Sequence, residues 1–183
     1  AIFFRTNAQS RPFEEAFIKY KIPYEVIGAR KFYERREIKN SLAYLKVINN
    51  PLDDISLIRI INVPPRNIGK TTQSKLQTLA QTMGLPLFEI LKRTDTIDGL
   101  SKGAIASIKN FVEMIQSIRE EQDGLYTTAE RVLSQSGYYD YLAKSKSTDD
   151  IERAKNVEEL ISSIKDYEDN NETASLAGYI EDI

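Results

Sequence analysis

The sequence of 183 residues contains no cysteine and no histidine. Without cysteine it can form no disulfide and perform no thiol chemistry, which is compatible with a cytoplasmic protein. Without histidine it lacks the commonest general base and metal ligand, so Ser-His-Asp, Cys-His and zinc chemistries are excluded. Carboxylates could still bind Mg²⁺, but no spacing singles out a pair. There is also no transmembrane run and no signal peptide, so we expect no membrane partner.

The net charge of −2 hides an uneven distribution. Residues 1–75 hold 14 Lys and Arg against 7 Asp and Glu, a net charge of +7, whereas residues 76–183 hold 11 against 20, a net charge of −9. The cations of the first part include Arg30, Lys31, Arg35, Arg36, Lys39, Lys46, Arg59, Arg66, Lys70 and Lys75. This excess is a suitable electrostatic footprint for a polyanion. The alternative is that these charges lie on ordinary solvated helix faces.

The apolar residues change along the chain from a strand pattern to a helical one. Residues 1–5 and 24–27 are predicted as short strands around a helix that begins near Ser10 and Pro12, which makes a β-α-β fragment of a larger sheet. From Phe32 onward the apolar residues recur at helical spacing. The predicted helices are 34–49, 53–62, 70–83, 86–93, 101–121, 127–136, 149–168 and 174–182.

The predicted fold class is therefore mainly α, with a multi-helix domain preceded by the short β-α-β fragment. The change of pattern places the domain boundary near residue 30, which gives domains of residues 1–30 and 31–183. Both ends of the sequence look cut, because residues 1–4 read as a buried strand without a lead-in and residues 175–183 as a helix without a cap. We expect a fragment of a longer protein.

Residues 62–72, with the sequence NVPPRNIGKTT, have two interpretations. Gly69-Lys70-Thr71 matches the end of a nucleotide-binding P-loop, whose backbone N–H groups wrap the phosphates. Such a loop needs glycine five positions before Gly69, where this chain has Pro64 followed by Pro65, and proline has no N–H to donate. The segment before it also starts like a helix, with Asp53 as an N-cap, and not like the strand that a P-loop follows.

The second interpretation is a helix–hairpin–helix element. One helix, about 53–62, stops at the two prolines, Arg66, Asn67, Ile68 and Gly69 make the turn, and Lys70, Thr71 and Thr72 open the next helix. The free N–H groups and the dipole of a helix start favour an anion, glycine lets a phosphate approach closely, and Lys70 adds charge. Ile68 is predicted to anchor the hairpin in the core. The alternative is an ordinary helix–turn–helix connection without a ligand.

Two other clusters carry polar groups suited to nucleic acid. Residues 5–11, RTNAQSR, follow a predicted strand and offer Arg5, Asn7, Gln9 and Arg11 as donors, although a simple capping turn is nearly as good an explanation. In residues 31–39, KFYERREIK, the aromatic pair beside two arginines either stacks on bases or docks a helix onto the core, with the charges paired along the helix.

These three blocks, at residues 5–11, 32–39 and 60–69, occur in this order and near this spacing in the UvrD/PcrA/Rep-type superfamily 1 DNA helicases, which the chain resembles. The resemblance covers the whole chain, but its specificity lies in residues 1–75. It implies that residues 1 to about 30 are an edge of the RecA-like motor domain 2A, and that residues 31–183 are most of the helical accessory domain 2B.

The resemblance also implies residue roles. Arg5 and Asn7 match positions that contact single-stranded DNA, and residues 66–72 match the Gly-Ile-Gly hairpin that grips the duplex backbone. The first glycine of that hairpin is Asn67 here, and asparagine tolerates positive φ better than most residues. The Walker A and B segments are absent, so the fragment should hold no catalytic residue, metal or cofactor and should not hydrolyse ATP. ATP and Mg²⁺ belong to the longer protein.

The leading hypothesis is thus a DNA-binding accessory and regulatory part of an ATP-dependent 3′→5′ DNA helicase. Its expected partners are DNA, as a junction of duplex and single strand, and the remaining motor domains of the same protein. A second hypothesis is an autoinhibitory protein-interaction domain with little DNA affinity, which the acidic helical half supports. A third is a P-loop nucleotide hydrolase that uses Lys70.

Overall fold

The computed structural model describes residues 1–5, 7–28, 31–121, 123–144 and 147–183. Within these ranges the chain is mainly α-helical, so the predicted fold class is confirmed in its main feature. The α-helices are α1 Arg11–Lys19, α2 Arg36–Asn49, α3 Asp54–Ile60, α4 Lys70–Met83, α5 Leu87–Leu91, α6 Lys102–Glu120, α7 Leu125–Gln135, α8 Tyr138–Ala143, α9 Thr148–Asn170 and α10 Leu176–Asp182. Short 3₁₀ turns cover Asn7–Ser10, Phe32–Glu34 and Thr94–Thr96. None of the described helices has the length and apolarity needed to span a bilayer.

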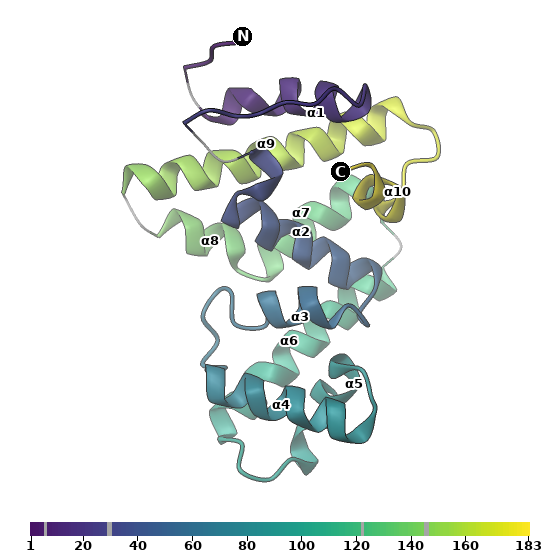
Figure 1. The fold of residues 1–183 in the computed structure, drawn as a ribbon. Helices are drawn as coiled ribbons and strands as arrows, with labels where there is room; N and C mark the ends of the chain where they lie inside the picture. Colours follow the sequence, from purple (N-terminus) through teal and green to yellow (C-terminus); the bar gives the residue numbers. More distant parts are fainter. Residues whose placement is uncertain (6, 29–30, 122, 145–146) are drawn as a thin grey trace.

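Helix α2 runs through the centre of the molecule (Figure 1) and contacts α3, α6, α7, α9 and α10. Most residues of α2 are buried, polar ones included, and Ile38, Tyr44, Leu45 and Val47 are fully buried. Helices α3, α4 and α5 form one end of the molecule together with the first part of α6, and α9 and α1 form the other (Figure 1). The single core therefore joins helices that are far apart in the sequence.

Local capping signals set several of the helix boundaries. The side chain of Asp53 accepts a hydrogen bond from the amide of Ser56 at the start of α3, as predicted. The hydroxyls of Ser101 and Ser147 cap α6 and α9 in the same way. Helix α4 ends at Gly84, whose φ of +62° gives the left-handed C-cap that glycine favours. Helix α8 is not among the predicted helices.

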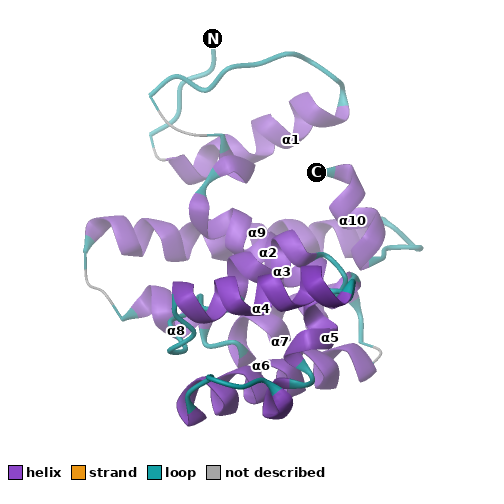
Figure 2. Ribbon diagram, turned by 60° about the horizontal axis from the view of Figure 1, so that its bottom comes forward, coloured by secondary structure: helices purple, strands orange, loops and turns teal. Residues whose placement is uncertain are grey.

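The two predicted strands are not observed. Residues 1–5 and 24–27 flank α1 in the sequence and are drawn as loops (Figure 2), and the predicted helix between them is present as α1. A strand is defined by ladder hydrogen bonds to a neighbouring strand, and these two segments find no such partner within the described ranges. The second segment runs back along α1, and the rings of Phe17 and Tyr24 lie 5.3 Å apart.

Polar contacts hold the N-terminal segment against the helical body. Glu14 is only 2% exposed and accepts hydrogen bonds from the amide of Phe32 at 3.0 and 3.1 Å. Arg35 donates to the hydroxyl of Ser10 (2.9 Å) and to the carboxamide oxygen of Asn156 on α9 (2.8 Å). Burial lowers the pKa of Arg35, against the opposing influence of Glu14 and other carboxylates. The segment is therefore anchored by specific hydrogen bonds and not by a sheet.

Candidate nucleic-acid interface

Residues 61–69 form a hairpin between α3 and α4 at one edge of the molecule (Figure 1). The carboxamide of Asn62 organises it, because its Oδ1 accepts hydrogen bonds from the amides of Arg66 (2.7 Å) and Ile68 (3.2 Å). Ile68 is fully buried, which confirms that it anchors the hairpin in the core. Asn67 is exposed and has a φ of +60°, a conformation that asparagine adopts more readily than most residues. Sequence reasoning missed the role of Asn62, although it stands at the start of the candidate stretch.

The guanidinium of Arg66 is directed into the protein. Its Nη1 donates to the carbonyl oxygens of Ile60 (3.0 Å), at the end of α3, and of Pro64 (3.2 Å) in the hairpin. Its Nη2 donates to the hydroxyl of Tyr44 on α2 (2.6 Å) and to the carbonyl of Ser136 (2.9 Å), just after α7. Burial raises the pKa of Tyr44, although Arg66 acts to lower it. Only a planar fork of donors can serve so many acceptors at once, and Arg66 thereby ties the hairpin to three helices.

The start of α4 is open to solvent. Its N-cap, Gly69, has φ −67° and ψ 169°, close to the values of the capping residues Ser101 (−71°, 150°) and Ser147 (−70°, 148°). A Cβ at Gly69 would meet nothing within 4 Å. Serine would therefore fit here and supply a capping bond, so neither backbone conformation nor packing requires glycine at this position.

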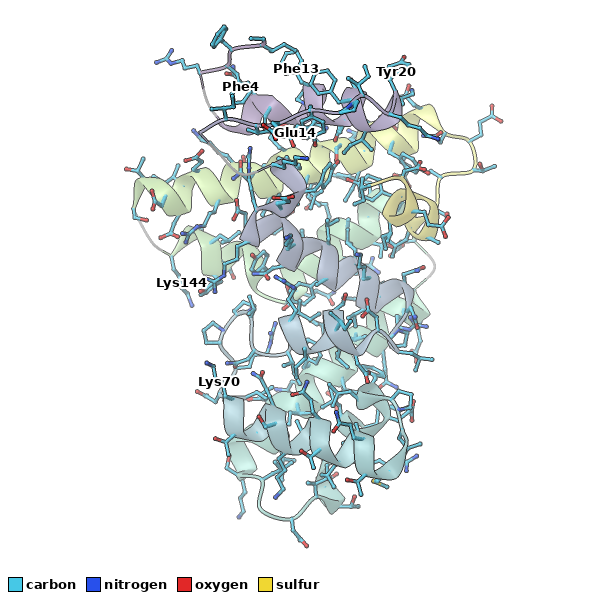
Figure 3. The ribbon with its side chains drawn as sticks, viewed as in Figure 1. Phe4, Phe13, Glu14, Tyr20, Lys70 and Lys144 are labelled. Atoms are coloured by element: carbon cyan, nitrogen blue, oxygen red, sulfur yellow. The ribbon has the colours of Figure 1, made fainter. Side chains whose placement is uncertain are left out.

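No described side chain accepts a hydrogen bond from the amides of Lys70, Thr71 or Thr72, the first residues of α4. Lys70 and Thr71 are exposed, and Thr72 is half-buried. Figure 3 shows the side chain of Lys70 extending away from the body of the molecule, and Lys70 forms no ion pair with a described residue. A helix start of this kind combines unpaired N–H donors, the positive end of the dipole and a free ammonium group.

Helix α7 also begins after a glycine, and its first amides bind a carboxylate of the same chain. Its N-cap is Gly124, with φ −60° and ψ 162°, again without a capping side chain of its own. The carboxylate of Glu168 on α9 occupies this start and accepts hydrogen bonds from the amides of Leu125 (2.6 Å) and Tyr126 (3.3 Å). A Cβ at Gly124 would lie 2.7 Å from the carboxylate oxygen. The absence of a side chain at Gly124 leaves room for the carboxylate in its observed position.

The hairpin does not fit the phosphates of a nucleotide in the manner of a P-loop. The element before it is helix α3, where a P-loop follows a strand. Pro64 and Pro65 have no N–H, and the amides of Arg66 and Ile68 are directed at Asn62. The donors that would surround a β-phosphate are thus missing or engaged within the turn.

The other predicted DNA-binding residues lie elsewhere. Arg5 is exposed near the N-terminus, where its amide donates to the side chain of Gln9 (2.9 Å). Asn7 belongs to a 3₁₀ turn, and its side chain lies outside the described part of the structure. This turn lies beside α1, at the opposite end of the molecule from α4 (Figure 1), so the structure does not bring the two predicted sets together.

The aromatic residues of the third block serve the fold. Phe32 is fully buried, and the hydroxyl of Tyr33 donates to Glu15 on α1 (2.9 Å). The helix-docking interpretation of this block is therefore the one that the structure supports. Arg30 lies outside the described residues.

The protein is thus a helical domain in which a hairpin, fixed by the hydrogen bonds of Arg66, presents an open helix start to solvent. The chain belongs to the UvrD-like helicase C-terminal domain family, whose profile matches residues 1–183, so the family-level prediction is confirmed. It is similar to an ATP-dependent DNA helicase PcrA of Staphylococcus epidermidis strain RP62A, with 46% identity over 187 residues, and to one of Staphylococcus aureus strain Mu50, with 43% identity. Each comparison covers 100% of this chain and 26% of the relative, so the chain spans about a quarter of the length of these curated relatives.

Proposed function

We propose that this chain is a DNA-binding accessory part of an ATP-dependent 3′→5′ DNA helicase and grips the duplex backbone through its hairpin as a helix–hairpin–helix element. The family and the printed names of the relatives support the helicase context. The observation that carries the proposal is the open start of α4, where Gly69 leaves the amides of Lys70 and Thr71 without a cap although serine would fit. A DNA phosphate takes the place that the Glu168 carboxylate takes on α7.

Each hairpin residue then has a distinct task. Gly69 admits the phosphate, the first amides of α4 and the hydroxyls of Thr71 and Thr72 donate to it, and Lys70 neutralises it. Ile68 fixes the hairpin in the core, and Asn67 supplies the left-handed turn. Arg66 acts as a brace that sets the direction of the hairpin. Because the contacts reach only phosphates, binding is independent of sequence and sensitive to salt.

The substitution Gly69→Asp tests this proposal with two readouts of opposite sign. Aspartate is among the best N-cap residues, so the variant should gain a few tenths of a kcal/mol in the free energy of unfolding. Its carboxylate should occupy the phosphate position, so affinity for a fluorescent hairpin duplex with a single-stranded tail should fall at least tenfold in anisotropy titrations at low salt.

Ser101→Asp is the matched control, because it adds the same charge at the capped start of α6. The control should bind within about twofold of the unmodified chain. Equal affinity of the Gly69→Asp variant and the unmodified chain would refute the assignment of the hairpin as the DNA grip.

Exposed apolar side chains at the other end of the molecule form a surface that a partner domain would cover. Phe3 is 94% exposed, Ile27 93% and Tyr20 70%, and a groove of about 700 Å³ lies between the N-terminal residues and α1. Figure 3 shows Phe13 and Tyr20 on the outer side of α1. The remaining strands of a RecA-like motor domain 2A would cover this surface and would turn the two unpaired segments into a β-α-β edge.

In the longer protein, Arg5 and Asn7 would then contact single-stranded DNA along that motor. ATP and Mg²⁺ would bind the motor segments outside this chain, and a cytoplasmic location belongs to the same proposal. We expect the 183-residue chain alone to hydrolyse no ATP. Turnover that disappears in Lys70→Ala would instead support the nucleotide hydrolase.

An autoinhibitory protein-interaction domain is the second candidate, and the exposed apolar surface of residues 1–28 favours it. The two candidates differ in what the hairpin contributes. A pull-down of the separately produced motor domains by the Lys70→Glu variant measures docking, and anisotropy measures DNA binding. Retained docking together with unchanged DNA affinity would favour the interaction domain.

A further inference from the structure

A cleft of about 290 Å³ lies directly beside the hairpin. Three parts of the chain meet there: the hairpin through Asn67, helix α6 through Ser107 and Asn110, and the end of α7 through Gln135. Its apolar lining includes Phe111, which is 2% exposed. The cleft is thus built by segments about 70 residues apart, and the Arg66–Ser136 hydrogen bond holds two of them together.

Apart from Arg66, the described residues that line this cleft are uncharged, and several carry hydrogen-bonding groups. Three carboxamides, of Asn67, Asn110 and Gln135, and the hydroxyl of Ser107 line it, and no acidic residue does. The guanidinium of Arg66 lies 5.2 Å from the ring of Phe111, and among the described residues of the lining it adds the only formal charge.

A second cavity of the chain differs from this cleft because its lining is acidic. The cavity of about 580 Å³ between α1, α9 and α10 is lined by one cation, Lys19, and by four acids, so its negative balance would repel a polyanion. The acids are Glu15, Asp166, Glu181 and Asp182. The cleft beside the hairpin lacks this repulsion, and its amide and hydroxyl groups can donate to phosphate and sugar oxygens without adding charge.

The cleft lies within reach of the strand that the hairpin holds. Asn67 belongs to both, and Lys70 lies three positions further along the chain, a span of at most roughly 10 Å. Charges on one DNA strand recur about every 3.4 Å along the helix axis. A span of roughly 10 Å corresponds to about three nucleotides at this spacing, so a strand with one phosphate at the start of α4 can place one of its next three nucleotides beside the cleft.

We propose that this cleft binds the deoxyribose–phosphate backbone of a nearby nucleotide on the strand held by the hairpin, through uncharged hydrogen bonds from Asn110, Gln135 and Ser107. The inference rests on the proposed DNA grip and extends its footprint from the hairpin to α6 and the end of α7. DNA contacts of the hairpin and DNA contacts of the cleft should differ in how their binding free energy depends on salt. Lys70 displaces a counterion when it neutralises a phosphate, whereas a carboxamide displaces none.

The test measures duplex affinity at several salt concentrations for Asn110→Ala, Gln135→Ala and Lys70→Ala. Each cleft variant loses about one hydrogen bond, so its affinity should fall about fivefold while the slope of log K against log [salt] stays unchanged. Lys70→Ala should lower the steepness of that slope by about one phosphate. Gln116→Ala is the matched control, because Gln116 is an exposed carboxamide on α6 outside the cleft.

A larger side chain at position 107 tests the cleft while its three carboxamides stay in place. Ser107→Tyr places a ring in the cleft and should also weaken binding, while urea unfolding reports whether the variant is folded. Binding of the folded cleft variants within twofold of the unmodified chain, or a reduced salt slope in them, overturns the cleft. An unchanged affinity and slope in Lys70→Ala refutes the hairpin grip instead, so the two failures are distinguishable.

Discussion

Substitution of Arg66 tests whether this residue fixes the hairpin or contacts a DNA phosphate directly. Arg66→Ala removes five side-chain hydrogen bonds of 2.6 to 3.4 Å, whose acceptors belong to Ile60, Ile61, Pro64, Tyr44 and Ser136. A hydrogen bond from a charged group contributes about 1.5–3 kcal/mol when buried, but Arg66 is half-buried and water can reach part of the vacated site. We therefore expect a loss of about 3 kcal/mol in the free energy of unfolding.

For a chain of this size such a loss lowers the thermal midpoint by roughly 6–12 °C. Urea unfolding followed by circular dichroism measures the free energy, and anisotropy titrations of the same samples measure DNA affinity. Arg66→Lys keeps the charge but cannot span the five acceptors, so it should recover less than half of the loss. DNA affinity should fall in both variants because the hairpin is no longer fixed, whereas the salt slope should stay unchanged.

The opposite pattern would refute this reasoning. If Arg66→Ala changes the free energy of unfolding by less than about 0.5 kcal/mol and lowers the salt slope by about one phosphate, then Arg66 is a direct phosphate ligand. The matched variant Lys70→Ala sets the scale, because Lys70 is exposed and should affect the slope without affecting stability.

Three further predictions concern the hairpin and its first helix. Ile68→Ala should lower the free energy of unfolding by about 2–5 kcal/mol in urea titrations, because it empties a fully buried site; a loss below 1 kcal/mol would contradict the anchoring role. Asn67→Ala should lose about 1 kcal/mol at its φ of +60°, whereas Asn67→Gly should be nearly neutral, and equal losses would argue against backbone strain. Burial acts to raise the pKa of Asp53, but hydrogen bonds from Ser56 outweigh it and hold the pKa below 3.8. The stabilisation by this cap is about 1 kcal/mol relative to Asp53→Ala. It should be complete above pH 3.8 and disappear as the pH falls through the folded pKa, and a difference between the two thermal midpoints that stays constant as the pH is lowered would contradict it.

Most helices could be predicted because their signals are local. Asp53 and Gly84 mark helix ends by capping chemistry that needs no distant partner. Helix α8 has only six residues and therefore too little periodicity to reveal itself. The predicted start of α2 at residue 34 came two residues early, because Arg35 adopts extended backbone and reaches across to Ser10 and Asn156.

The turn between α3 and α4 could be predicted from the sequence, but the hydrogen bonds within it could not. The prolines, Asn67 and Gly69 indicate the turn from its own sequence, and the structure has the left-handed residue where asparagine stands. A turn arginine reads as a surface cation, and its inward direction depends on the carbonyl of Ser136, 70 residues away. The strands were predicted from apolar composition, but a strand also needs a neighbour to pair with, which residues 1–5 do not find in the described ranges.

The brace at Arg66 also determines how mechanical load passes through the molecule. A force applied to the hairpin reaches Tyr44 in the central helix and Ser136 at the end of α7 directly through one guanidinium, without first stretching the loop. Because α2 and α7 also contact α9, the helical body should respond to a pull on the hairpin as one stiff lever. Torque generated elsewhere in a longer protein would then be delivered to the hairpin with little loss to bending, and any rotation on the DNA would carry the whole helical body with it.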